Sequence, residues 1–381
     1  MNHDPYSVLV VDDSAMMRSL VGRIVEADPR TRLAGKAANG RFALQKIESL
    51  QPDVILLDLE MPEMNGIEFL RERRRRGINT PVIVLSSLAT RGAKITMEAL
   101  ALGASDFVLK PSGSESPDIR VVADQIVELA VSLGTAYRAR HGDAPATREQ
   151  DAHGVGVASG SAATTRTTAS QPASAPRKAR ASRSAPGPVE LVAIGVSTGG
   201  PNALRKVFAL IPGDLDCSIV VVQHMPAGFT TEFAAGLNRV SALHVCEARD
   251  GDRLEPGTAY IAPGDYHLTV ERGHRNGEIR LNQDAPRNGH RPSADVLFAS
   301  VAHVYGDRAI GVIMTGMGRD GAAELGSIME AGGITLAQDE ASSVVYGMPR
   351  VAWEMGHVMR GVELAALADT ITDLVKERGR P

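Results

Sequence analysis

The sequence has few cysteines, few aromatic residues and no strong excess of either charge. Two cysteines in 381 residues are too few for a disulfide framework or a cysteine-based metal cluster. Aromatic residues make up 4% of the chain, and a net charge of −4 gives no basic excess that would indicate nucleic acid as a partner. No apolar run is long enough to span a bilayer, and the N-terminus lacks a cationic flank followed by an apolar signal segment. We therefore expect a cytoplasmic protein that neither binds nucleic acid nor inserts into a membrane.

The length and a break in composition indicate two domains. A chain of 381 residues is too long for a single hydrophobic core. Residues 141–188 are almost entirely small, polar or proline, and they lack the apolar periodicity that could offset the entropy of ordering them. We predict that this segment is a disordered linker rich in Ala, Ser, Pro and Gly. It would join a domain of residues 1–140 to a domain of residues 189–381.

Both domains alternate apolar runs with amphipathic segments, which predicts an α/β fold. In the first domain the runs SVLVV, RLAGKA, DVILLD, PVIVLSS and DFVLK predict five strands with helices between them. Strands that are apolar throughout are typical of a parallel sheet covered by helices on both faces. We expect a five-stranded parallel sheet in the first domain. In the second we expect a doubly wound, mostly parallel sheet with a β-hairpin at residues 266–281.

Polar side chains stand at the ends of several strands of the first domain. Asp12 and Asp13 follow the first strand and Asp58 ends the third, while Ser86 and Lys110 end the fourth and fifth. Carboxyl ends of parallel strands share one edge, and three carboxylates that meet there need a cation such as Mg²⁺. We predict that the three aspartates bind Mg²⁺ and that Asp58 accepts a phosphoryl group, supported by Ser86 and Lys110. Acidic residues that merely cap the following helices are the alternative, which fits one aspartate better than the whole set.

Ser197 lies in the glycine-rich stretch GVSTGGP, residues 195–201, directly after the apolar run LVAIG. Pro201 at the first helical position would place Ser197 on a turn between a strand and a helix. The spacing Gly195-x-Ser197-x-Gly199 fits a nucleophile elbow, although so short a match is weak. A phosphate cradle fits less well, because a dinucleotide fingerprint requires glycine at position 197 and a nucleotide-binding loop requires Gly-Lys-Ser/Thr. A simple helix cap is a third alternative.

A nucleophilic serine needs a base and an acid that orients the base. His224 follows the apolar strand SIVVV, and Asp320 follows the strand AIGVIM. We predict a catalytic triad in which Ser197 is the nucleophile, His224 the base and Asp320 the orienting acid. A core histidine and a helix-capping aspartate are the alternatives for the last two. The order Ser-His-Asp along the chain differs from the Ser-Asp-His order of α/β-hydrolases, so that fold is not predicted.

Motifs in both domains resemble one known family. VVDDS, LLDLEMPEMNG and the pair Lys110-Pro111 are similar to the flavodoxin-like receiver domain of two-component systems, whose phosphorylated aspartate falls on Asp58. GVSTGGP, QHMP, GHRPSADVLF, MTGMGRDG and QDEASSVVYGMP resemble the catalytic domain of CheB-type chemotaxis protein-glutamate methylesterases. The order of receiver and then esterase is also that of the family. The segment between the two domains is longer than is usual there.

The resemblance implies a phosphorylation-regulated serine hydrolase. It would demethylate glutamate γ-methyl esters, and deamidate glutamines, on methyl-accepting chemotaxis receptors. The receptors would be its substrate and a chemotaxis histidine kinase its phosphodonor. The resemblance further implies that Thr198 helps to hold His224 and that the backbone N–H of Met317 serves the oxyanion hole. Mg²⁺ would belong to the receiver, no cofactor would serve the esterase, and we expect a monomer.

Two alternatives remain from the residues themselves: a non-enzymatic response regulator whose second domain binds a partner, and an acyltransferase with the same triad. Other charged residues predict local roles. Residues 73–76, all arginine, would cover the solvated end of a helix, and His267 would lie on an exposed strand face. Arg291 would contact an acidic receptor surface or form a structural salt bridge.

Overall fold

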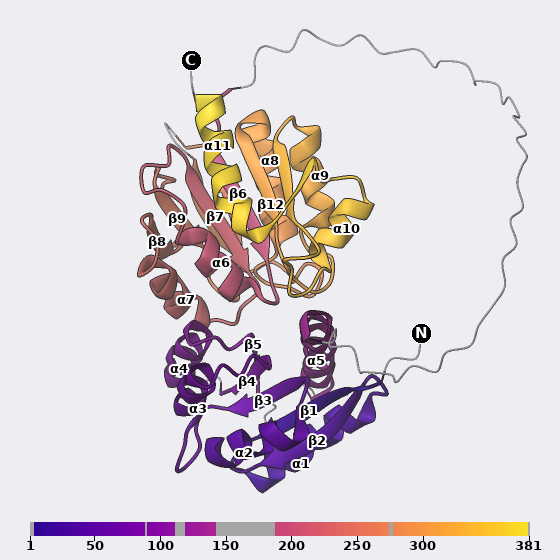
Figure 1. Cartoon of the computed structure of the whole chain (residues 1–381). Helices are drawn as coiled ribbons and strands as arrows, with labels where there is room; N and C mark the ends of the chain where they lie inside the picture. Colours follow the sequence, from indigo (N-terminus) through magenta and orange to yellow (C-terminus); the bar gives the residue numbers. More distant parts are fainter. Residues whose placement is uncertain (1–3, 88–89, 111–118, 142–186, 274–276, 380–381) are drawn as a thin grey trace, which may run out of the picture.

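The computed structural model of the chain describes residues 4–87, 90–110, 119–141, 187–273 and 277–379. Figure 1 shows two lobes. One ends with α5 (Ile119–His141), and the other begins with β6 (Leu191–Val196). Almost all of the predicted linker, residues 141–188, lies outside the described residues. Within the described part of the chain, no helix is both long and apolar enough to cross a membrane.

The N-terminal lobe is a five-stranded parallel sheet with the strand order β2-β1-β3-β4-β5, as predicted. Its other elements are β1 (Tyr6–Val11), α1 (Ala15–Ala27), β2 (Thr31–Ala37), α2 (Gly40–Leu50), β3 (Val54–Asp58), α3 (Gly66–Arg75), β4 (Val82–Ser86), α4 (Thr90–Ala101) and β5 (Asp106–Leu109). Alternate strand residues face opposite layers: Val8 and Val10 pack with α1 and α5, whereas Leu9 and Val11 pack with α2, α3 and α4. The sheet is therefore buried on both faces, which explains its uninterrupted apolar strands.

The C-terminal lobe contains a seven-stranded parallel sheet, with the order β14-β13-β12-β6-β7-β9-β8, and an antiparallel hairpin. Its strands are β7 (Ser218–Gln223), β8 (His244–Glu247), β9 (Thr258–Ile261), β10 (His267–Glu271), β11 (Glu278–Asn282), β12 (Ala309–Ile313), β13 (Ile334–Gln338) and β14 (Arg360–Val362). Its helices are α6 (Gly200–Phe208), α7 (Phe229–Asn238), α8 (Ala294–Tyr305), α9 (Ala322–Glu330), α10 (Met348–Glu354) and α11 (Leu367–Gly379), with short 3₁₀ turns at Gly306–Arg308 and Leu364–Ala366. Helices α6, α7 and α11 cover one face, while α8, α9, α10 and the hairpin cover the other. The predicted mostly parallel sheet and hairpin are confirmed.

Arg73 and His267 are buried, and the predictions that placed them at the surface are wrong. Arg73 is buried at 8% exposure, and its guanidinium donates to the backbone oxygens of Thr80 and Gly103. It therefore ties α3 to the loops that precede β4 and β5 instead of covering a solvated helix end. His267 is 1% exposed, because its side of the hairpin packs inward, and its Nε2 lies 3.2 Å from the backbone oxygen of Ala285. Helix α6 also begins one residue before Pro201, at Gly200.

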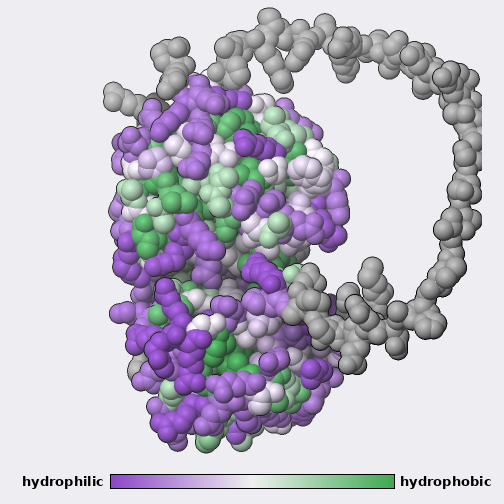
Figure 2. Space-filling model, in the orientation of Figure 1, coloured by the Kyte–Doolittle hydropathy of each residue, from purple (hydrophilic) through white to green (hydrophobic). Residues whose placement is uncertain are grey.

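The two lobes are in contact through the β5 edge of the N-terminal sheet. Figure 1 shows α4, β5 and α5 facing the lower end of the other lobe. Phe107 of β5 stacks on Phe229 at the start of α7, with ring centroids 5.0 Å apart. The side-chain amide of Asn202 in α6 donates to the backbone oxygen of Ala104 over 2.6 Å. Hydrophilic side chains cover most of the visible face of both lobes, with smaller apolar patches between them (Figure 2).

Candidate functional site

Ser197 lies on a tight turn at the carboxyl end of β6, as predicted. Its backbone N–H donates to the backbone oxygen of Thr315, and its backbone oxygen accepts from the N–H of Gly200. Gly199 has a φ of 76°, and a Cβ there would lie 2.6 Å from Val344. A Cβ on Gly200 would lie 2.0 Å from Oε1 of Gln223. The two glycines are therefore required because the strand has to turn into α6 within a crowded space.

His224 and Asp320 form a buried pair beside this turn. Strand β6 lies between β12 and β7, so the carboxyl ends that lead to Asp320, Ser197 and His224 are neighbours. Nε2 of His224 lies 2.8 Å from Oδ2 of Asp320. Because a carboxylate only accepts, Nε2 is assigned the proton and Nδ1 the lone pair. Nδ1 is buried and has no hydrogen-bond partner among the described residues.

Asp320 occupies a site built to hold a negative charge. Oδ1 accepts from the hydroxyl of Ser293 over 2.6 Å and from the amide of Asn288 over 3.0 Å, and Oδ2 accepts from the backbone N–H of Ala294 over 2.6 Å. The last of these lies in the first turn of α8, where the helix dipole favours an anion. Burial alone would raise the pKa of Asp320, but the hydrogen bond from His224 and these donors hold it well below its usual range. The carboxylate is therefore ionised at neutral pH.

A glutamine side chain fastens the serine turn to the end of β7. Gln223 is 2% exposed, and its Nε2 donates to the backbone oxygens of Ser197 and His224. This bridge holds the two strand ends at a set spacing. Gln223 is the first residue of the motif QHMP, but the motif alone does not indicate that its side chain bridges two strand ends.

A cleft of about 600 Å³ opens over Ser197 and His224, and both lobes line it. On the C-terminal side its walls include Ser197, Thr198, His224, His290 and Met317. On the N-terminal side they include the strand β5, Lys110, and Val122, Gln125 and Leu129 of α5. Among the described residues, no hydrogen bond joins Ser197 to His224 or Thr198 to His224. Catalytic hydrogen bonds are often longer in a free enzyme than with substrate bound, so the roles predicted for these residues stay predictions.

Asp106 of the N-terminal lobe contacts the serine turn. Its Oδ2 accepts from the backbone N–H of Gly199, at the start of α6, over 2.9 Å. The carboxyl group is fully enclosed between the lobes, and this burial raises its pKa to about 6. Strand β5 thus carries Asp106 at one end and leads to Lys110 at the other. The sequence contained no signal for this contact, because it joins residues of two separate domains.

The carboxylates of Asp12, Asp13 and Asp58 gather at the carboxyl edge of the N-terminal sheet, with one ligand oxygen of each within 4.8 Å of the others. Lys110 Nζ lies 3.0 Å from Asp12 and 2.8 Å from Asp58. Burial raises the pKa of Asp58, and the neighbouring Asp12 adds to this. Oxygen donors of this kind are the ligands that Mg²⁺ prefers, and Asp13 is exposed, so the residues fit the predicted ion. Ser86 is buried next to the cluster, with its hydroxyl 2.6 Å from that of Thr96.

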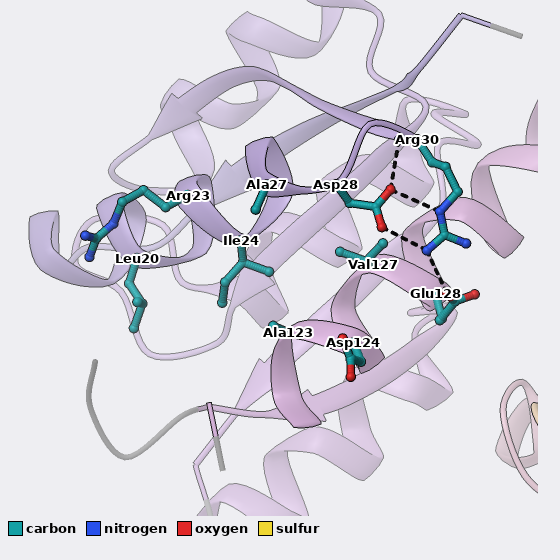
Figure 3. Close-up of a pocket in the computed structure, with 10 residues that line it drawn as sticks. All are labelled: Leu20, Arg23, Ile24, Ala27, Asp28, Arg30, Ala123, Asp124, Val127 and Glu128. Carbon is teal, nitrogen blue, oxygen red and sulfur yellow. Dashed lines mark hydrogen bonds and ion pairs between the residues drawn. The ribbon is translucent and has the colours of Figure 1, made fainter. Parts of the chain in front are cut away.

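Another hollow, of about 470 Å³, lies between α1 and α5 on the N-terminal lobe (Figure 3). Arg30 at its edge pairs with Asp28 over 3.0 Å and with Glu128 over 2.7 Å. The polar groups at this end therefore satisfy one another, and none of the predicted site residues lines the hollow. We assign no chemistry to it.

The N-terminal lobe is doubly wound and carries an acidic cluster, and the C-terminal lobe carries Ser197, His224 and Asp320. This combination defines the class of protein: a response regulator with a hydrolase output domain. Residues 8–119 match the family described as response regulator receiver domain, and residues 192–371 match the CheB methylesterase family. A protein-glutamate methylesterase/protein-glutamine glutaminase of Treponema denticola is 50% identical, covering 97% of this chain and 98% of the relative. Proteins of the same name from Treponema pallidum (50% identical, 97% of both chains) and, as number 2, Koribacter versatilis (45%, 97% of this chain and 96% of the relative) also match. The chain therefore belongs to the CheB methylesterase family.

The resemblance inferred from the motifs is confirmed, together with the fold class. The relatives carry the names of enzymes, which supports the hydrolase over a non-enzymatic output domain. Arg291 forms an ion pair with Asp265, and its guanidinium also donates to two backbone oxygens of the loop. This salt bridge was one of the two alternatives considered for Arg291.

Proposed function

We propose that this chain is a phosphorylation-regulated esterase that removes methyl from glutamate γ-methyl esters of methyl-accepting chemotaxis receptors. It would also deamidate glutamine side chains of the same receptors. The observation that carries the proposal is the buried His224–Asp320 pair: Nδ1 of His224 has no hydrogen-bond partner among the described residues, and His224 and Ser197 line the same cleft. The names of the relatives, which include both activities, support the choice of substrate.

The chemistry follows from these groups. Oγ of Ser197 attacks the γ-carbonyl carbon of the substrate while Nδ1 of His224 takes the hydroxyl proton, and the Asp320 carboxylate stabilises the imidazolium that forms. Backbone N–H groups, with that of Met317 proposed among them, stabilise the tetrahedral oxyanion. Collapse of this intermediate breaks the ester bond, and His224 returns the proton to the leaving methoxide, which departs as methanol. Water activated by His224 then hydrolyses the acyl-enzyme to glutamate and free Ser197; with an amide substrate the first product is ammonia.

In the receiver, Asp12, Asp13 and Asp58 would hold Mg²⁺, which neutralises charge on a phosphoryl group during transfer. A carboxylate oxygen of Asp58 would attack the phosphorus of a phosphohistidine on a chemotaxis kinase, so that the P–N bond breaks and the kinase imidazole leaves. Lys110 would pair with the phosphoryl oxygens, and Ser86 would donate a hydrogen bond to one of them. We propose the domain limits 1–140 and 189–381 with the linker 141–188, and we expect the protein to act as a monomer in the cytoplasm.

The receiver would restrain the esterase through the contact between the lobes. Asp106, Phe107 and their strand form one wall of the cleft, so the docked receiver narrows access to Ser197. Phosphorylation of Asp58 changes the partner of Lys110, which directly follows the same strand. A few kcal/mol of differential contact is enough to shift such an equilibrium.

The test is methanol release from a methyl-labelled receptor. Ser197→Ala should lower the rate by about 10³-fold or more, because it removes the attacking oxygen. Ser241→Ala, after α7 in the same lobe, serves as the matched control and should leave the rate unchanged. Near-normal methanol release from folded Ser197→Ala protein would show that this mechanism is wrong.

A further inference from the structure

The ring of His290 lies flat against the ring of His224. Their centroids are 3.8 Å apart, and the two planes differ by 8°. His290 comes from the loop between β11 and α8, not from a neighbouring strand end. It therefore contacts the flat face of the proposed base, whereas Asp320 contacts the edge of the ring at Nε2.

The loop that carries His290 is itself held in place. The backbones of Arg287 and His290 exchange two hydrogen bonds, of 3.1 and 2.9 Å. Asn288, between them, donates its amide to Asp320 over 3.0 Å and to Asp295 over 2.7 Å. Nε of Arg291 donates to Asp265 over 3.0 Å. One loop thus supports both members of the His-Asp pair, since Asn288 reaches the acid and His290 the base.

A single hydrogen bond does not fix an imidazole ring. The χ2 torsion of histidine is broad, so the bond from Nε2 to Asp320 leaves the plane of the His224 ring free to tilt. Such a tilt would move Nδ1, which is the atom that has to take the proton of Ser197. A flat surface against the ring removes this freedom, because tilting would drive the two rings together.

The charge state of His290 suits this task. Burial lowers the pKa of His290 to about 4, and the charge of His224 contributes. His290 is therefore neutral at the pH where His224 acts as a base. A neutral ring neither competes for Asp320 nor repels the imidazolium that forms on His224, and its π face favours that cation.

On the basis of the function proposed above, we propose that His290 is a positioning residue: its ring stacks on His224 and fixes the plane from which Nδ1 takes the proton of Ser197. His290 forms no bond to the substrate in this role. Its contribution is geometric and acts only while His224 moves the proton. Loss of the stack should therefore lower kcat and leave KM nearly unchanged.

Two substitutions of similar bulk separate a flat surface from mere packing. His290→Leu fills the space without a planar face, whereas His290→Phe keeps the planar face without ionisable nitrogens. We expect kcat for receptor methyl esters to fall by about 10- to 100-fold in His290→Leu, as for other small displacements of catalytic groups. In His290→Phe most of that loss should be recovered. His303→Ala, an exposed histidine of α8, is the matched control and should behave as wild type.

A second measurement follows Ser197 without the receptor. The rate at which a fluorophosphonate labels Ser197 reports how well His224 activates it, and it should fall in His290→Leu by a factor similar to that for kcat. Thermal melting of each variant checks folding. Equal labelling rates and equal kcat in the leucine and phenylalanine variants would overturn the positioning role, as would a change confined to KM. If wild-type Ser197 is not labelled at all, it is instead the proposed function that fails.

Discussion

Each lobe has a buried aspartate at the carboxyl edge of its parallel sheet, Asp58 in one and Asp320 in the other. The pKa values of these two groups are shifted in opposite directions. Asp58 is 4% exposed and Asp320 is 1% exposed, so burial does not distinguish them. Burial raises the pKa of Asp58, helped by the charge of Asp12, whereas the donors around Asp320 hold its pKa far below the usual range. Burial raises the pKa of both carboxyl groups; the hydrogen bonds around Asp320 outweigh that effect, whereas the pairing of Asp58 with Lys110 does not.

The difference suits two kinds of chemistry. Asp58 has few donors besides Lys110 and lies beside an exposed carboxylate, so its oxygens are open to a cation and a phosphoryl group. The oxygens of Asp320 are occupied by Ser293, Ala294 and Asn288 as well as by His224, so this carboxylate orients and stabilises but does not react. In both lobes the carboxyl edge of a parallel sheet positions the aspartate, and the loops at that edge determine which groups contact its oxygens and so whether it can react.

The largest expected effect comes from neutralising the acid in the C-terminal lobe. Asp320→Asn should lower the esterase rate by about 10⁴-fold while leaving the fold intact, because an amide holds His224 in the wrong tautomer. Methanol release from labelled receptor measures this, with exposed Asp373→Asn in α11 as the control. A rate within tenfold of wild type would mean that Asp320 does not orient the base.

The same change in the N-terminal lobe should act differently. Asp58→Asn should abolish labelling of the chain by Mg²⁺ and a small radiolabelled phosphodonor, because the attacking carboxylate is gone. The unphosphorylated esterase rate should stay near wild type, and stimulation by the phosphodonor should be lost. Undiminished label in Asp58→Asn would place the phosphoryl group on another residue.

A smaller effect is expected where the lobes meet. Asp106→Ala removes the acceptor for the N–H of Gly199, so the receiver should dock less tightly and the unphosphorylated rate should rise by roughly 3- to 30-fold, as for one or two kcal/mol of lost contact. Asp124→Ala, exposed on α5 away from the cleft, is the matched control. A fragment of residues 189–381 should also exceed the unphosphorylated full chain. If both rates stay unchanged or fall, the receiver does not inhibit by covering the cleft.

The smallest effect is a pH dependence of docking. Burial between the lobes raises the pKa of Asp106 to about 6 from an ordinary value of 3.8, so the docked form binds an extra proton between these values. Docking should therefore strengthen as the pH falls through 6 and lose this contribution above it. The rate of the full chain divided by that of the fragment 189–381 should be lower at about pH 5.5 than at about pH 7.5. In Asp106→Asn this ratio should not change with pH; an unchanged ratio in wild type would contradict the prediction.

Strands and the residues at their ends were predicted correctly from the sequence, because both depend on the pattern of neighbouring residues. Apolar runs predicted all five strands of the first sheet, and the strand-end rule brought Asp12, Asp58 and Lys110 together as observed. Prediction failed where a side chain's neighbours come from distant segments. Arg73 and His267 were expected at the surface and are buried, because the loops and hairpin that cover them have no signature at those positions.

By itself, the sequence determined the two-domain α/β architecture and the places of Ser197, His224 and Asp320, since apolar periodicity and strand order need only local information. Only the tertiary structure decided that His290 stacks on His224 and that Asp106 meets Gly199 across the lobes. These contacts join segments that are far apart in the chain. Their geometry follows from packing and from hydrogen bonds between segments that the fold brings together, which no single stretch of sequence encodes.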